Sequence, residues 1–198
     1  MNKPAPTTIP LLEAISDRWS PRSFEPRPVE PAKLRTLLEA ARWAPSCYNE
    51  QPWRFIVATR EDAAFDRLAN CLVEANHWAV NAPVLLLSIA RTTFAKNGKP
   101  NRHAWHDVGL AMGILCVQTT ALGLHLHQMA GFDPARACSE FAIPDGYEPV
   151  AVAALGYVGN PNVLPEPLRA AELAPRERRE LRESVFSERF GAPAPLLA

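Results

Sequence analysis

The spacing of apolar residues along the chain predicts alternating helices and strands. Apolar side chains recur at three- and four-residue steps through 31–44, and Pro31 suits the first turn of a helix. The strongest helical pattern runs through 104–122 and ends at Gly123, a residue type that commonly terminates helices. Further helices are expected at 9–18, 61–79, 133–143 and 174–191.

Short apolar runs predict the strands. Residues 53–59 (WRFIVAT) are rich in aromatic and β-branched side chains, and 83–90 form a continuous apolar run typical of a buried strand. Alternation in 124–130 and a further apolar run in 149–159 predict two more strands. Because helices and strands alternate, we expect a central sheet covered by helices.

The predicted helix 104–122 is apolar on all sides. Met112 and Leu115 lie on one side of it, and Leu110 and Ile114 lie on the other. A helix with this pattern is buried, either in the centre of a domain or in a subunit interface.

Composition indicates a single globular domain. The chain has 198 residues, of which 47% are hydrophobic and 21% are charged. The formal net charge is zero, which argues against a nucleic-acid-binding protein and means that any anion site is local. The N-terminus does not resemble a signal peptide, and the apolar runs are too short to span a bilayer. We therefore expect a cytoplasmic protein that does not enter a membrane.

The cysteines and histidines do not form a recognisable metal-binding pattern. The four cysteines are far apart and read as reduced thiols, with no C-x-x-C pair. His103 and His106 lie near the start of one predicted helix, whereas His125 and His127 lie on one predicted strand. Since these pairs belong to different elements, we expect no metal site.

Motifs for nucleophilic catalysis and nucleotide binding are missing from the sequence. It has no G-x-S-x-G, no G-x-G-x-x-G and no G-x-x-x-x-G-K-[ST], and Cys47 gives only weak support for a Cys–His pair. Two arginine clusters remain, Arg18 with Arg22 near the start and 176–179 near the end. Each cluster suits either a solvated surface or, if the two meet in space, a seat for a phosphate group.

Five segments occur in an order that matches one known family. RWSPRSF (18–24) is similar to an opening R-x-S-x-[RK]-x-F, and AARWAPSCYNEQPWRF (40–55) is similar to A-A-x-x-A-P-S-x-x-N-x-Q-P-W-x-F. Segments 106–134, 143–157 and 175–186 follow as a central helix leading to G-F-D, a late strand and a closing basic segment. In this order they resemble the nitroreductase family of FMN-dependent NAD(P)H oxidoreductases.

The resemblance implies an architecture and an assembly. It implies a single α+β domain over 1–198, with a central, mostly antiparallel sheet, flanking helices and extended terminal arms. It also implies a homodimer with shared flavin sites, in which the long helix 104–122 lies at the interface.

The resemblance also implies the residues that bind FMN. Arg18, Ser20 and the backbone of Trp19 would bind the ribityl-phosphate, and Arg22 would lie near N1 and O2 of the ring. Pro45, Ser46 and Asn49 would come from the partner subunit. Ala130 and Gly131 would lie near N5. Arg176 and Arg178 would complete the phosphate site, where Arg179 is an alternative ligand to Arg178.

The implied activity is hydride transfer from NADH or NADPH through the flavin to a small-molecule electron acceptor, in a ping-pong cycle. Nitroaromatics, quinones and similar conjugated compounds are the expected acceptors, and no protein acid or base is expected to be catalytic. A flavin dehydrogenase, a dehalogenase or a flavin-fragmenting enzyme of the same fold is the alternative. A flavin-binding dimer without turnover is the non-enzymatic alternative.

Overall fold

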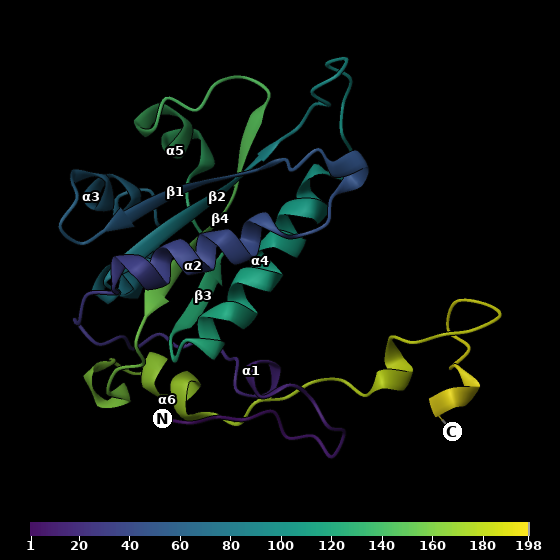
Figure 1. The fold of residues 1–198 in the computed structure, drawn as a ribbon. Helices are drawn as coiled ribbons and strands as arrows, with labels where there is room; N and C mark the ends of the chain where they lie inside the picture. The colour runs from purple at the N-terminus through teal and green to yellow at the C-terminus, as the bar shows by residue number, and fades with distance from the viewer. Residues whose placement is uncertain (198) are drawn as a thin grey trace.

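The computed structural model describes residues 1–197, and its centre is a four-stranded sheet (Figure 1). The strands are β1 (Trp53–Thr59), β2 (Val84–Arg91), β3 (His125–Met129) and β4 (Tyr147–Gly156). They lie in the order β1-β2-β4-β3, and every neighbouring pair is antiparallel. The predicted strands are therefore confirmed, and the fold is α+β with an antiparallel sheet.

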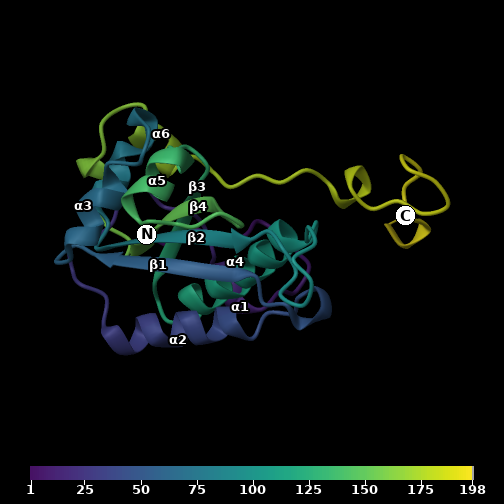
Figure 2. The same ribbon diagram turned by 90° about the horizontal axis from the view of Figure 1, so that it is seen from above.

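Helices cover both faces of this sheet. Figure 2 shows α2 (Pro31–Arg42) on one side, and α4 (Ala104–Ala121) packs with α2 against that face. On the other side, α3 (Ala63–Ala69) and α5 (Pro134–Glu140) pack against the second face. Since β2 is buried between the two helical layers, almost every residue in it is apolar.

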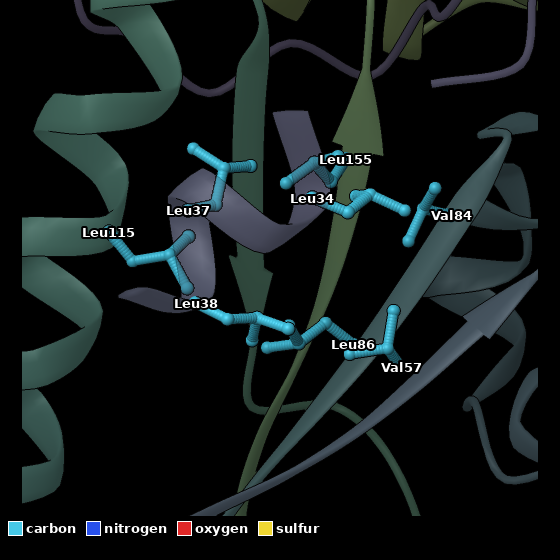
Figure 3. Close-up of a pocket in the computed structure, with 8 residues that line it drawn as sticks. All are labelled: Leu34, Leu37, Leu38, Val57, Val84, Leu86, Leu115 and Leu155. Atoms are coloured by element: carbon cyan, nitrogen blue, oxygen red, sulfur yellow. The ribbon is translucent and has the colours of Figure 1, made fainter. Parts of the chain in front are cut away.

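The first helical layer packs tightly on the sheet. Leu34, Leu37 and Leu38 of α2 and Leu115 of α4 meet side chains from three strands (Figure 3). The cavity left between them has a volume of about 10 Å³, which is too small for a ligand. This region is core, and any binding site lies elsewhere.

The prediction of a helix over 61–79 is correct only for its first half. The chain leaves α3 at Asn70, and Leu72 then pairs with Phe132 as an isolated bridge. A 3₁₀ segment, η2 (Glu74–Asn81), follows. The Val73 amide donates to the carbonyl oxygen of Gly131, so tertiary pairing here replaces continued helix.

The C-terminal segment also differs from its prediction. An arginine-rich helix is expected over 174–191, but the structure has no α-helix there. A 3₁₀ turn, η4 (Leu181–Glu183), is followed by turns, bends and an isolated bridge between Phe186 and Pro193. Figure 1 shows this arm leaving the body of the molecule, so it has no surface on which to bury a helical stripe. A short helix that was not predicted, α6 (Leu168–Leu173), precedes it.

The remaining short elements are α1 (Glu13–Ser16), which replaces the longer helix expected over 9–18, and three 3₁₀ turns. The turns are η1 (Cys47–Asn49), η3 (Pro161–Val163) and η5 (Pro195–Leu197). Asp133 caps α5 by accepting a hydrogen bond from the Arg136 amide at 3.0 Å.

Helix α4 is buried on one side only within a single chain. Val108 and Leu115 are fully buried, whereas Trp105 is 46% exposed and Leu110 is 36% exposed. The helix is therefore central to the domain along one face and leaves an apolar second face uncovered. Among residues 1–197, no helix is long and apolar enough to cross a membrane.

The packing predicts a large cost for shortening Leu115. We expect Leu115→Ala to lower the free energy of unfolding by about 2–5 kcal/mol, because it removes a fully buried side chain from between α2, α4 and the sheet. Urea denaturation measures this loss. Leu173→Ala, at a side chain 53% exposed, is the control and should cost less than about 1 kcal/mol.

Candidate functional site

The N- and C-terminal arginine clusters line one cavity of about 310 Å³. The loop after α1 supplies Arg18, Trp19, Ser20 and Arg22, while the segment after α6 supplies Arg176 and Arg178. Two residues that were not predicted, Lys3 and Glu172, line the same cavity. The structure thus brings together all the residues expected at the phosphate end of a flavin, and Arg179 is not among the residues that line this cavity.

A buried carboxylate fixes the loop that carries Arg18 and Arg22. Glu172 is 1% exposed and accepts hydrogen bonds from the backbone N–H of Arg22, at 2.9 and 3.0 Å, and of Ser23, at 3.1 Å. Its Oε2 also lies 4.0 Å from Nη1 of Arg22. Because Glu172 lies on α6, this carboxylate joins the two ends of the chain across the cavity.

The cations of the cavity crowd one another. Burial lowers the pKa of the Arg176 guanidinium, and the charges of Arg18 and Arg178 lower it further. Nη1 of Arg176 donates hydrogen bonds to the carbonyl oxygens of Lys3 and Ser16, each at 2.6 Å, and so holds the N-terminal segment in place. Positive groups brought this close together favour an anion between them.

Two histidines of β3 support the loop from the side of the sheet. His127 Nδ1 lies 2.9 Å from the carbonyl oxygen of Pro21, and its ring lies 4.7 Å from that of Trp78. His125 meets Trp19 edge-on at 5.8 Å. Burial is the main cause that lowers the pKa of both imidazoles. The loop 18–22 therefore packs on two rings whose burial favours the neutral imidazole.

Gly131 lies where another segment approaches the backbone closely. Its carbonyl oxygen accepts hydrogen bonds from Asn76 Nδ2 at 2.9 Å and from the Val73 amide at 3.2 Å. A Cβ at this position would lie 2.5 Å from Asn76 Nδ2, so a larger residue would displace the Asn76 side chain from its hydrogen bond to Gly131. Ala130, just before it, is exposed, which leaves this stretch of backbone at the surface.

The loop 45–52 is held in an unusual backbone conformation. Tyr48, Asn49 and Gln51 all have positive φ, between 48° and 56°. Asp107, which is 2% exposed, accepts from the Cys47 amide at 2.9 Å, and Ser46 Oγ accepts from the Gln51 amide at 3.0 Å.

These bonds present polar groups and one aromatic ring at the surface. Asn49 is exposed, and Tyr48 is 89% exposed with its ring edge-on to Phe94 at 6.3 Å.

Within a single chain, the loop 45–52 lies apart from the arginine cavity. The loop is bonded to Asp107 in the first turn of α4, whereas the arms and α6 lie toward the opposite end of that helix (Figure 1). A helix of 18 residues is about 27 Å long. Pro45, Ser46 and Asn49 are therefore separated within the chain from Arg18 and Arg178.

Sequence reasoning missed Lys3, Glu172, Asn76 and Asp107. Lys3 lies in a proline-rich arm, and Glu172 lies in a short helix with no strong apolar pattern. Each of the four acts through contacts with residues far away in the sequence, which the sequence alone does not reveal. Only Asp107 could have been noticed, because it is an acidic residue in an otherwise apolar helix.

The described residues 1–197 contain no group of three or more His, Cys, Asp or Glu side chains placed to hold a metal. The cysteines in this part of the chain are free. Burial raises the pKa of Cys71 and of Cys116, which fits inert thiols.

Burial of His127 predicts a pH-dependent stability. Its native pKa lies below the ordinary value of 6.5, so the unfolded chain binds the proton more readily. Stability present above pH 6.5 is then lost as the pH falls through the native pKa. We expect wild type to lose more unfolding free energy than His127→Gln between pH 7.5 and 5.5, measured by urea denaturation. His77→Gln, at an exposed histidine, should behave as wild type does.

The chain is similar to known proteins in sequence and in fold. The family model described as "Nitroreductase family" matches residues 15–77 and 69–157. A crystal structure described as an oxidoreductase containing FMN superposes with a TM-score of 0.89 at 35% identity, covering 95% of this chain and 96% of that one.

Two curated proteins are also similar. An NADH dehydrogenase of Thermus thermophilus is 31% identical over 76% of this chain and 89% of its own. A nitrobenzene nitroreductase of Ectopseudomonas oleovorans is 40% identical over 35% of this chain and 30% of its own. The expected family is confirmed: the chain belongs to the nitroreductase family.

Proposed function

We propose that the protein is an FMN-dependent oxidoreductase that passes hydride from NAD(P)H to nitroaromatic, quinone or similar conjugated acceptors. The observation that carries this proposal is the cavity in which both arginine clusters meet. The FMN of the similar crystal structure and the names of the two curated relatives, an NADH dehydrogenase and a nitrobenzene nitroreductase, support it.

The donor set of the cavity fits a phosphomonoester. Arg18 and Arg178 offer guanidinium forks, which match phosphate oxygens. Ser20 Oγ, which accepts from Arg18 Nη1 at 3.2 Å, keeps its own hydroxyl proton to donate. The buried indole N–H of Trp19, a residue that lines the cavity, has no acceptor among residues 1–197. Nη1 of Arg18 and Nη1 of Arg178 already donate, to Ser20 Oγ and to the Glu177 carbonyl oxygen. A phosphate would supply an acceptor for the Trp19 N–H and for the other N–H groups of the two guanidiniums.

The separation of the loop 45–52 from the arginine cavity within one chain supports a shared site in a homodimer. Arg18 and Arg178 of one chain would bind the phosphate, while Pro45, Ser46 and Asn49 of a second chain would reach the ring. The uncovered apolar face of α4, with Trp105 and Leu110, supplies a surface for this association.

Bound FMN would supply the hydride chemistry, and the chain supplies position and charge. The buried Glu172 carboxylate fixes the backbone of Arg22 and lies 4.0 Å from its guanidinium, which places one positive charge beside the cavity. A cation at the pyrimidine edge of a flavin favours negative charge there. Gly131 lets η2 pack closely on the backbone that would face N5.

Two other functions use the same residues. A flavin dehydrogenase, dehalogenase or flavin-fragmenting enzyme would bind FMN equally well but would not turn over with NAD(P)H and a nitro or quinone acceptor. A flavin-binding dimer without turnover would bleach only with dithionite.

The cofactor and donor are tested together. We expect the protein purified from cells to show the absorbance spectrum of oxidised FMN, since the cavity suits its phosphate. Adding NADH or NADPH without oxygen should bleach that spectrum, and a nitroaromatic or a quinone should restore it. A protein that binds FMN but bleaches only with dithionite would contradict the proposed activity.

The shared site predicts complementation between two defective chains. Arg18→Ala and Asn49→Ala would each damage both sites of their own homodimer. In a mixed dimer, one site takes Arg18 from the second chain and Asn49 from the first, and is intact. Co-expression in equal amounts should therefore restore about one quarter of the sites, measured as FMN bound per chain.

A matched pair serves as the control. Arg18→Ala with Arg178→Ala places both defects in the same half of the site, so no mixed dimer contains an intact site. Equal recovery in the two pairings, or none in either, would contradict the shared arrangement.

A further inference from the structure

The N-terminal arm brings a cation into the arginine cavity. Residues 1–14 precede the part of the chain that the family model matches, which begins at residue 15. Lys3 nevertheless lines the cavity together with Arg18, Ser20 and Arg178. A hydrogen bond holds the arm there, because the Lys3 carbonyl oxygen accepts from Arg176 Nη1 at 2.6 Å.

The ammonium group of Lys3 is fixed in position. Its Nζ donates to the carbonyl oxygens of Glu172 at 2.7 Å and of Ala174 at 2.6 Å. It also lies 4.9 Å from the centre of the Trp19 ring. An ammonium has three donors, so these two acceptors leave one N–H for a ligand.

The surroundings of Lys3 favour an anionic ligand. Burial lowers the pKa of its ammonium, and the charges of Arg176 and Arg22 lower it further, whereas Glu172 raises it. The Glu172 carboxylate already accepts from two backbone amides and faces Arg22. The cavity is thus lined by two carboxylates, buried Glu172 and exposed Glu177, and by five cationic side chains: Lys3, Arg18, Arg22, Arg176 and Arg178.

We propose that Lys3 is a further ligand of the phosphate group and that the N-terminal arm is part of the binding site, an inference that rests on the proposed function. The spare N–H of the ammonium would donate to an oxygen of the phosphate. The phosphate would then be held by both ends of the chain, at residues 3 and 178.

A purely structural role for Lys3 makes a different prediction. If its two carbonyl contacts at the end of α6 were its whole role, their loss would weaken the binding of FMN and of riboflavin alike. A phosphate ligand, by contrast, acts on FMN and not on riboflavin, which has the same ring and ribityl chain without the phosphate.

Binding of FMN and of riboflavin to the full-length apoprotein separates these roles. Flavin fluorescence quenching gives Kd for both ligands in wild type, Lys3→Met, Lys3→Arg and Lys96→Met. Methionine keeps an unbranched apolar stem beside Trp19 without the charge. Lys96 is exposed in the loop before α4, so its replacement is a control for the loss of one positive charge.

We expect Lys3→Met to raise Kd for FMN about tenfold, which equals about 1.4 kcal/mol, and to leave Kd for riboflavin within about twofold. Lys3→Arg should keep most of the FMN affinity, and Lys96→Met should match wild type. An equal loss of affinity for both ligands, or no loss for either, would overturn the assignment of Lys3.

The same measurements separate this inference from the proposed function. If wild type shows no preference for FMN over riboflavin, the phosphate site itself is wrong. If wild type prefers FMN and Lys3→Met keeps that preference in full, the site stands and the role of Lys3 fails.

Discussion

The hydrogen bonds between the Glu172 carboxylate and the amides of Arg22 and Ser23 hold the arginine cavity together. The carboxylate is fully buried, and such a group is stable only when its oxygens are satisfied. The two backbone amides satisfy it, and the nearby Arg22 guanidinium balances its charge. The loop after α1 and the segment after α6 are thereby locked together, although 150 residues separate Glu172 from Arg22.

The sheet and α4 set the larger geometry around this contact. Because β2 is covered on both faces, the sheet is a rigid layer that positions β3 and its two histidines under the loop. Helix α4 then separates the loop 45–52 from the arginine cavity, and Asp107 holds this strained loop at the start of the helix. The proposal of a shared site rests on this spacing and not on any single residue.

Patterns within the sequence were enough to predict the elements that bury their own side chains. Strand β1 has the predicted bounds, and α4 differs from its prediction by one residue at its C-terminal end, since periodicity and burial agree there. The prediction of a C-terminal helix was wrong, because a segment rich in charged residues gains little stability from forming a helix that has no surface to pack against. Lys3 and Glu172 could not be found in this way, because their roles depend on which distant carbonyls and amides they meet.

The cavity joins Lys3 near the first residue of the chain to Arg178 near the last. The strands and the helices that cover them are complete by Gly156, and almost every residue of the two core clusters lies before that point. The cavity, by contrast, also needs Glu172, Arg176 and Arg178. A chain that stops short of α6 would therefore keep a nearly complete core and lose one side of the arginine cavity.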